Sequence, residues 1–337
     1  MAEPAEQHGK AAGNGRPLAT ILLIAFNQQA TVGAAIEAAL AQTYTPLEVV
    51  ISDDASSDNT WAEIVSAAGR YSGPNRIVLN RNPNNLGIGA HLSHLVGLSH
   101  GEMLFIAAGD DVSLPQRCER VMDAWLASGR RLDLIASRLI DIDADGVAHG
   151  EIAPADLAHY RTLAQWAASP PHVVGAAQAW TRRVFERFGG LPAGVVAEDL
   201  IMVFRAIGCG GAATLPHTLV QYRRGGVSRR VRNHSATTVV ERLLMNNRHA
   251  VIELGQLLAD ARTLPGGEIV LPVLQLRLER ELFIQHLFGA PTRWQALKVL
   301  FGPARLNAGL RLRMGVYAMC PWVLTPFFAI KRSLARR

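Results

Sequence analysis

The stretch MLFIAAGDD at residues 103–111 decides the fold prediction, because an apolar run leads directly into two adjacent carboxylates. A continuous apolar run is typical of a strand that is buried on both faces of a parallel sheet. In an open parallel sheet, ligands bind just beyond the carboxyl ends of the strands. Side-by-side carboxylates repel one another unless a cation or hydrogen-bond donors compensate. Asp110 and Asp111 therefore predict a ligand site, and a divalent metal carrying a phosphate is the natural ligand.

Outward from this stretch, short apolar runs alternate with amphipathic segments between residues 19 and 140. The alternation predicts a βαβαβαβ order, and hence a mostly parallel sheet with helices on both faces. Helical patterns at 237–262 and 268–288 predict a helical C-terminal region after this α/β unit. The expected strands are 19–26, 47–52, 76–79 and 103–107, and the expected helices between them are 32–41, about 57–69 and 89–98.

Length and composition set the broad class. A chain of 337 residues exceeds the usual size of one hydrophobic core, and 49% hydrophobic content excludes a disordered protein. The net charge of +6 arises from Lys and Arg concentrated late in the chain, which suggests an anionic partner such as phosphate or acidic lipid. We expect no nucleic-acid partner, because no RNA-binding aromatic motif or basic recognition helix is present.

Cysteine spacing and the N-terminus give further limits. Cys118, Cys209 and Cys320 are far apart and indicate neither a disulfide framework nor a zinc site. Residues 1–17 are polar and lack the apolar segment of a signal peptide, so they predict a disordered lead to a cytosolic protein.

Polar residues follow each expected strand. Singly, they are ordinary turn and cap residues. Together they should converge on the rim where ligands bind in parallel sheets, which favours a nucleotide pocket. The residues are Asn27 after the first strand, Asp53 and Asp54 after the second, Asn84, Asn85 and Gly87 after the third, and Asp110 and Asp111 after the fourth.

The common phosphate-binding motifs are absent from the sequence. There is no GxxxxGK[ST] loop, and GIGAHL at residues 87–92 fails the GxGxxG pattern at its last position. Phosphate charge must then be met mainly by metal and arginine. Asp110 and Asp111 are the metal candidates, and Arg223 and Arg224, which precede two glycines, are the arginine candidates.

Seven motifs in this order resemble one known family over residues 19–228. The chain looks like an inverting glycosyltransferase of family 2, with the Rossmann-like GT-A fold, of the kind that builds bacterial surface polysaccharides. The motifs are AFN at 25–27, AQTY at 41–44, DDASSDNT at 53–60, NLGIGA at 85–90, GDD at 109–111, ED at 198–199 and YRRGGVS at 222–228.

The resemblance implies roles for individual residues. Asp110 and Asp111 match the element that binds Mg²⁺ or Mn²⁺ on the sugar-nucleotide diphosphate, and Asp199, preceded by Glu198, matches the catalytic base. Arg223 and Arg224 would bind the leaving diphosphate. The implied nucleotide-sugar contacts are Ala25, Phe26 and Asn27 against the nucleotide, Asp53 and Asp54 on base and ribose, and Asn85, Gly87 and Ala90 nearby.

Two positions depart from the family pattern. His91 stands where many relatives have asparagine, and Ala108 stands where many have the first aspartate of a longer acidic motif, so a metal here would depend on fewer carboxylates. His91 and His94 could pair on a metal, but no third ligand has a suitable spacing, so core or surface histidines are favoured.

The resemblance also implies that the acceptor lies beside residues 175–180. Trp180 would stack on a sugar face and His172 would lie at the acceptor site. A structural aromatic and a loop residue without a role are the alternatives for these two.

The chemistry fits these roles. Displacing a nucleoside diphosphate from a sugar needs its charge stabilised and a base on the opposite face of the sugar. One base without a second nucleophile suits inversion. We expect metal-dependent transfer from a nucleotide sugar to a glycan or lipid-linked acceptor at the cytoplasmic membrane face. A sugar-1-phosphate nucleotidyltransferase and a noncatalytic scaffold are the alternatives.

The expected domains are a lead at 1–17, a GT-A domain at 18–232 and a helical region at 233–337. The apolar segment 315–330 is shorter than the roughly 20 residues that span a bilayer, and Pro321 and Pro326 interrupt it. Contact with a membrane surface, packing on the catalytic domain and a homo-oligomer interface are the open alternatives for this segment.

Overall fold

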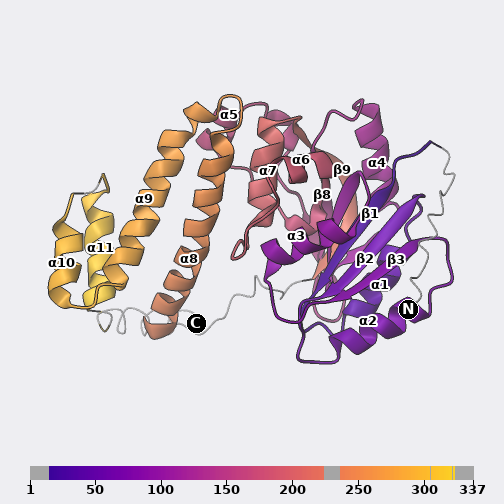
Figure 1. The fold of residues 1–337 in the computed structure, drawn as a ribbon, viewed down its shortest axis with the longest axis horizontal. Helices are drawn as coiled ribbons and strands as arrows, with labels where there is room; N and C mark the ends of the chain where they lie inside the picture. The colour runs from indigo at the N-terminus through magenta and orange to yellow at the C-terminus, as the bar shows by residue number, and fades with distance from the viewer. Residues whose placement is uncertain (1–14, 224–235, 304, 321, 323–337) are drawn as a thin grey trace, which may run out of the picture.

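The computed structural model describes residues 15–223, 236–303, 305–320 and 322 (Figure 1). Its strands form one sheet in the order β3-β2-β1-β4-β8-β6-β9-β5, and β7 pairs with β6. The strands are β1 (Ala19–Ala25), β2 (Leu47–Asp53), β3 (Arg76–Arg81), β4 (Met103–Ala108), β5 (Val112–Ser113), β6 (Leu134–Ile142), β7 (Ala148–Ile152), β8 (Gln178–Thr181) and β9 (Ala212–Arg223).

The helices lie on both sides of this sheet and continue beyond it into a C-terminal helical part (Figure 1). They are α1 (Val32–Leu40), α2 (Thr60–Gly69), α3 (Ile88–Leu98), α4 (Arg117–Ala127), α5 (Leu163–Ala168), α6 (Arg182–Arg187), α7 (Glu198–Gly208), α8 (Ala236–Ala261), α9 (Leu271–Phe288), α10 (Arg293–Phe301) and α11 (Ala308–Met319).

The strands β3, β2, β1 and β4 pair in parallel, as the sequence predicts. β1 is hydrogen-bonded on both edges, and this central position explains its unbroken apolar sequence. Beyond β4 the sheet is mixed: β8 pairs antiparallel with β4 and with β6, whereas β6 and β9 pair in parallel. The parallel half therefore presents the carboxyl ends of β1, β2 and β4 at one rim.

Two hydrophobic clusters cover the two faces of the sheet. Ile21 faces the cluster that contains α1, α2 and α4, whereas its neighbour Leu22 faces the cluster of α3, α5, α6, α7 and α8. Successive strand residues point to opposite faces, so one strand supplies both cores. The predicted α/β fold with helices on both faces is confirmed.

The C-terminal helices confirm the predicted helical region; α8 and α9 join the second of these clusters, whereas α10 and α11 pack with α9 in a separate one. Arg205 of α7 and Asp260 of α8 form a buried ion pair, with Nε and Oδ2 at 2.7 Å. Leu257 and Ala261 of α8 pack in the same cluster as α7. The predicted domain boundary at 232/233 falls in residues 224–235, outside the described part of the chain.

The predicted tail segment 315–330 lies mostly outside the described residues, and α11 covers only its start. Among the helices that the structure describes, none combines the length and apolar character needed to cross a membrane.

Candidate active site

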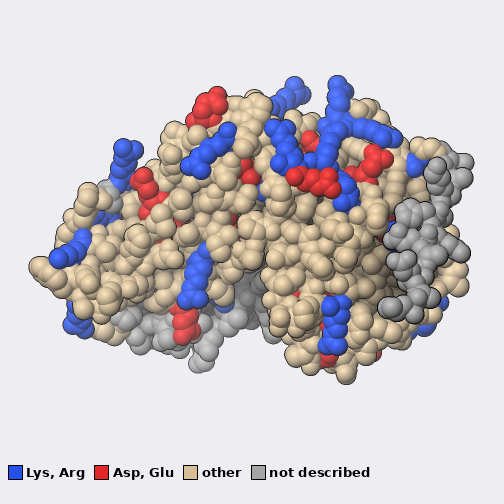
Figure 2. Space-filling view, in the orientation of Figure 1, with Lys and Arg blue, Asp and Glu red and all other residues tan. Residues whose placement is uncertain are grey.

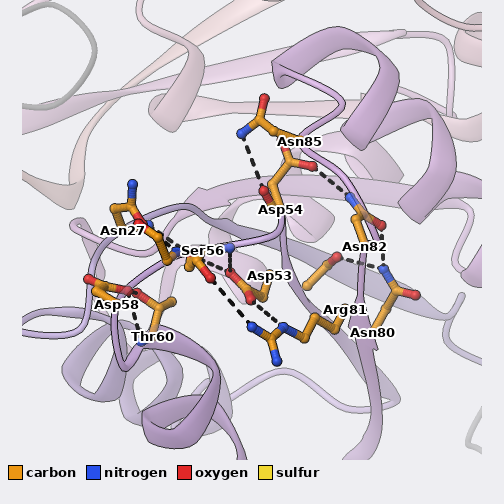
Figure 3. A network of polar contacts seen from close by, with 12 residues as sticks. Asn27, Asp53, Asp54, Ser56, Asp58, Thr60, Asn80, Arg81, Asn82 and Asn85 are labelled. Carbon is orange, nitrogen blue, oxygen red and sulfur yellow. Dashed lines mark hydrogen bonds and ion pairs between the residues drawn. The ribbon is translucent and has the colours of Figure 1, made fainter.

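The loop after β1 is tied to the loop after β2. The Asn27 N–H donates to Ser56 Oγ at 2.8 Å, and Asn27 Oδ1 accepts from the Ser57 N–H at 2.9 Å (Figure 3). Asn27 has φ of 52°, a left-handed conformation that asparagine tolerates better than most residues. Ala25 is buried at the strand end, whereas the Phe26 ring is 47% exposed. The rim thus presents an aromatic surface beside a rigid polar loop.

Asp53 turns inward at the end of β2. Its side chain is fully buried; Oδ1 accepts from the Ser56 N–H at 3.1 Å and from the Ser56 hydroxyl (Figure 3). Its Oδ2 accepts from Arg81 Nε at 3.1 Å. Protein donors therefore occupy both oxygens, as a buried carboxylate requires.

Asp54 is also buried and supports the start of α3. Its Oδ1 accepts from Asn82 Nδ2 at 2.8 Å and from the Leu86 N–H at 2.9 Å, and Oδ2 accepts from the Gly87 N–H at 3.0 Å. An anion is favoured at this helix N-terminus.

The carboxylates of Asp53 and Asp54 both accept hydrogen bonds from main-chain and side-chain N–H groups of the rim loops. Their predicted contacts with base and ribose stay a prediction.

The α3 start brings a second segment to the rim. Gly87 has φ of 73°, which favours glycine, and Asn85 Nδ2 donates to the Asp54 carbonyl at 3.2 Å. A Cβ at Gly89 would lie 2.9 Å from the Pro192 carbonyl, so α3 packs closely on the loop that leads to α7. Asn85 is exposed, and Gly87 and Ala90 are partly exposed at this junction.

His91 is a core residue. Its Nε2 lies 2.6 Å from Ser52 Oγ, and burial lowers the pKa of the imidazole. His94 is exposed. In the part of the chain that the structure describes, no group of three or more His, Cys, Asp or Glu side chains could hold a metal by itself. The structure thus places His91 in the core and His94 at the surface.

The GDD loop fits tightly against β1. A Cβ at Gly109 would lie 2.6 Å from Gln28 Oε1 and 3.1 Å from the Ala25 Cβ, so glycine lets this loop approach the end of β1 closely. Asp111 is 6% exposed, and its Oδ1 accepts from the Arg223 N–H at 2.8 Å. Burial and the neighbouring Asp110 raise the pKa of Asp111 to about 7. Burial also raises the pKa of Asp110.

This acidic pair suits a divalent cation. The buried Arg117 guanidinium lowers the pKa of Asp111, but burial and Asp110 outweigh it. A cation would offset the remaining cost of two adjacent charges. Mg²⁺ typically uses one or two carboxylates together with substrate phosphate oxygens, so the two aspartates fit such an ion without a complete protein cage.

Arg223 is the last residue of β9 and packs against the GDD loop, which its side chain holds in place. Its Nε donates to the Asp110 carbonyl at 3.1 Å, and its Nη1 donates to the carbonyls of Asp143 and Ala144 at 2.8 and 2.7 Å. The predicted diphosphate contact would have to use its remaining donor or a rearranged side chain. Arg224 lies outside the described residues.

Glu198 and Asp199 form the first turn of α7. Burial and the charge of Asp199 raise the pKa of Glu198. Burial, and then the charge of Glu253, raise the pKa of Asp199, while the exposed His172 lowers it. A Cβ at Gly175 would lie 2.5 Å from Glu198 Oε1, so the predicted acceptor segment does meet this carboxylate pair.

Two residues that the sequence analysis missed position this turn. Glu253 of α8 accepts from the N–H groups of Val196 and Ala197 at 3.1 and 2.8 Å. Gln178 Nε2 donates to the Asp199 carbonyl at 3.4 Å, and the Gln178 carbonyl accepts from Arg117 Nη2 at 3.1 Å. Gln178 therefore links the α7 turn to the buried arginine next to Asp111. No sequence spacing signals these long-range contacts.

Trp180 does not lie at the acceptor site. Its side chain is fully buried, its Nε1 donates to Gln178 Oε1 at 2.8 Å, and its ring stacks on Phe185 with centroids 6.2 Å apart. The prediction that it stacks on a sugar is wrong, because β8 is covered on the face that this ring occupies. The alternative of a structural aromatic is correct.

The class of protein follows from the fold and from comparison with known sequences. The sheet, with its acidic loop after β4, is the GT-A architecture, and the glycosyl transferase family 2 model matches residues 20–189. The chain belongs to glycosyl transferase family 2.

The alignments with two relatives cover only part of each relative's length. EpsE of Bacillus subtilis, named as a glycosyltransferase, is 30% identical over 42% of this chain and 50% of its own length. The succinoglycan biosynthesis protein ExoO of Rhizobium meliloti is 26% identical over 64% of each chain. The chain thus spans only half to two thirds of these relatives.

A solved structure with the same fold is the mannosyltransferase PcManGT of Pyrobaculum calidifontis, in complex with GDP-Man and Mn²⁺. It has a TM-score of 0.53 and 18% identity, and the match covers 92% of this chain and 87% of that one. At this identity the likeness shows the fold.

Proposed function

We propose that this protein is an inverting, metal-dependent glycosyltransferase that moves a sugar from a nucleoside-diphosphate sugar to a glycan or lipid-linked acceptor in bacterial polysaccharide biosynthesis. The observation that carries the proposal is the link from the GDD loop through Arg117 and Gln178 to the α7 turn. The proposal assigns the GDD loop to the leaving-group side of this rim and the α7 turn to the base side. The proposal places the transferase domain at 18–232 and the helical region at 233–337.

Asp199 is the proposed base. Its carboxylate takes the proton of the acceptor hydroxyl as the hydroxyl oxygen attacks the anomeric carbon. Because burial raises its pKa, the group is a stronger base than an ordinary aspartate and stays largely ionised near neutral pH. Glu198 is more deeply buried, and its pKa is raised above that of Asp199, so Glu198 keeps its proton to higher pH.

The leaving group departs toward the GDD loop. Asp111 and Asp110 would hold Mg²⁺ or Mn²⁺, which when bound neutralises diphosphate charge. The relative that binds Mn²⁺ and GDP-Man supports this choice. Phe26 and Asn27 would lie against the nucleotide, with Ala25 beneath them and Asn85, Gly87 and Ala90 nearby. Arg223 keeps the loop in place, and Arg224 is proposed to meet the diphosphate.

The acceptor would enter beside Gly175 and His172, next to Asp199. The proposed location is the inner face of the cytoplasmic membrane, where a lipid-linked acceptor is available. ExoO, a relative named for succinoglycan biosynthesis, supports the polysaccharide assignment.

A donor-hydrolysis assay tests the activity. Purified protein is incubated with a panel of nucleotide sugars and Mg²⁺ or Mn²⁺, and released nucleoside diphosphate is measured. We expect nucleoside diphosphate to be released from one class of donor. A metal chelator should abolish this release. Pyrophosphate chemistry would instead indicate a nucleotidyltransferase, and no turnover or donor binding would indicate a scaffold. NMR of the transferred sugar's anomeric proton tests inversion.

A further inference from the structure

The α10 and α11 helices pack on α9 through one set of side chains. Within the described residues, other large apolar side chains of these helices are exposed. Phe283 and Leu287 of α9 form a cluster with Ala296 and Leu300 of α10 and Met314 of α11. Arg311 Nη2 donates to the Gly302 carbonyl at 2.6 Å, which fastens α11 to the end of α10. The helical end therefore has a fixed shape.

The exposed large apolar side chains lie on α10, on α11 and just beyond α11. Trp294 and Phe301, two turns apart on α10, are 67% and 79% exposed, and Lys298 lies between them with its Nζ 5.8 Å from the Trp294 ring. Leu312 of α11 and Trp322 beyond it are 67% and 70% exposed. Single exposed apolar residues need no explanation, but aromatics gathered at one end indicate a contact surface.

α10 and α11 carry only positive charges, and Glu279 of α9 lines a pocket beside Lys298 and Arg305. Residues 282–337 contain nine Lys or Arg and no Asp or Glu. Arg293, Lys298, Arg305 and Arg313 are exposed on the described part. Figure 2 shows Lys and Arg side chains over the α10 and α11 end, on the left, without acidic atoms beside them.

We propose that the exposed side of α10 and α11, with Trp294, Phe301 and Leu312, docks on an anionic membrane surface. Aromatic and leucine side chains at a surface helix enter the headgroup boundary, and Lys and Arg contact lipid phosphates. A second copy of the chain is a poor occupant, because two equally positive ends repel each other.

This inference deepens the proposed function, since it would hold the site near a lipid-linked acceptor. Its physical basis is independent of catalysis. The surface requires no helix that crosses the bilayer.

Co-sedimentation of the full chain with vesicles tests the surface. We expect binding to vesicles of phosphatidylglycerol and phosphatidylcholine, with little binding to phosphatidylcholine alone. The double variant Trp294→Ser and Phe301→Ser should bind the anionic vesicles at least about tenfold more weakly. Lys298→Gln and Arg313→Gln should each weaken binding by about fivefold at low salt. Val147→Ser changes an apolar residue on the β6–β7 turn that is 57% exposed; it is the control and should bind normally.

Donor hydrolysis is measured in parallel for every variant. Unchanged hydrolysis with lost vesicle binding supports the docking surface, whereas absent hydrolysis with normal binding removes only the proposed activity. The inference is overturned if the wild-type protein does not bind anionic vesicles. It is also overturned if the double variant co-sediments with them as much as the wild type does. A wild-type dimer that the double variant converts to a monomer without lipid also overturns it, in favour of an oligomer interface.

Discussion

At the scale of single residues, Asp199 carries the chemistry and its surroundings set when it can act. The carboxylate faces Glu198, Glu253 and His172, and burial raises its pKa above the ordinary aspartate range. Because the base must be ionised, activity should rise with pH through a limb that lies above that range. A pH profile of kcat/KM measures this limb.

Asp199→Asn should lower kcat by at least about 10²-fold, since general base catalysis typically contributes 10²- to 10⁴-fold. Asparagine keeps nearly the same shape, so nucleotide affinity, measured by calorimetry with metal present, should hardly change. Loss of nucleotide binding in this variant would refute the base assignment.

Asp111 gives a stability prediction. Its pKa is about 7 in the folded chain and near 3.9 when unfolded, so the folded state binds the proton more tightly. The stabilisation of the folded state by this bound proton is present below about pH 4 and is lost as the pH rises through about 7. Asp111→Asn can still accept from the Arg223 N–H but carries no charge. It should raise Tm at pH 8 by about 2–6 °C, with little gain at pH 4.

Mg²⁺ or Mn²⁺ provides the control for this prediction. Either ion should raise the Tm of the wild type at pH 8, because it binds only the folded carboxylates, and should not raise that of Asp111→Asn. Equal metal effects on both proteins would move the metal site elsewhere.

At the scale of elements, α8 controls the geometry of the α7 turn. Glu253 accepts from two main-chain N–H groups before α7 that lie 57 and 56 residues earlier in the sequence, so α8 braces the turn that carries the base. Glu253→Gln retains an acceptor but removes the charge that raises the pKa of Asp199. The acidic limb of kcat/KM should therefore move to lower pH, with kcat at its plateau within about threefold of wild type.

Glu253→Ala and Glu241→Gln separate the two effects. Glu253→Ala leaves two N–H groups without their acceptor and should lower kcat at every pH, whereas Glu241→Gln, exposed on the same helix, should leave the profile in place. An acidic limb that does not move in Glu253→Gln contradicts the electrostatic part of this prediction.

Periodicity predicted the elements that bury a regular face. The strands β1 to β4 and the long helices α8 and α9 lie within a few residues of their expected bounds. The short elements β8 and α6 lack enough residues to show a period, and Gln178 shows its role only when β8 is placed between β4 and β6. Trp180 was placed correctly in the chain but is fully buried, since local sequence does not determine which side chain a tertiary contact covers.

At the scale of the whole molecule, α8 packs directly on α7, the helix that begins with Glu198 and Asp199. α7 and α8 share one hydrophobic cluster, and the Arg205–Asp260 pair is almost completely buried, with side chains 0% and 3% exposed. Arg205 Nη1 also donates to the Gly190 carbonyl at 2.9 Å. The two parts should therefore unfold together.

Asp260→Asn tests this coupling, because it leaves the Arg205 charge buried with a weaker partner. Breaking a buried pair typically costs about 3–5 kcal/mol, so the urea midpoint should fall strongly and the transition should remain single. Arg138→Gln is the matched control. It removes a half-exposed pair with Glu151, and such pairs contribute about 1 kcal/mol or less. Two separate transitions in Asp260→Asn, one at the wild-type midpoint, would show that the C-terminal helices fold independently of the site that Glu253 braces.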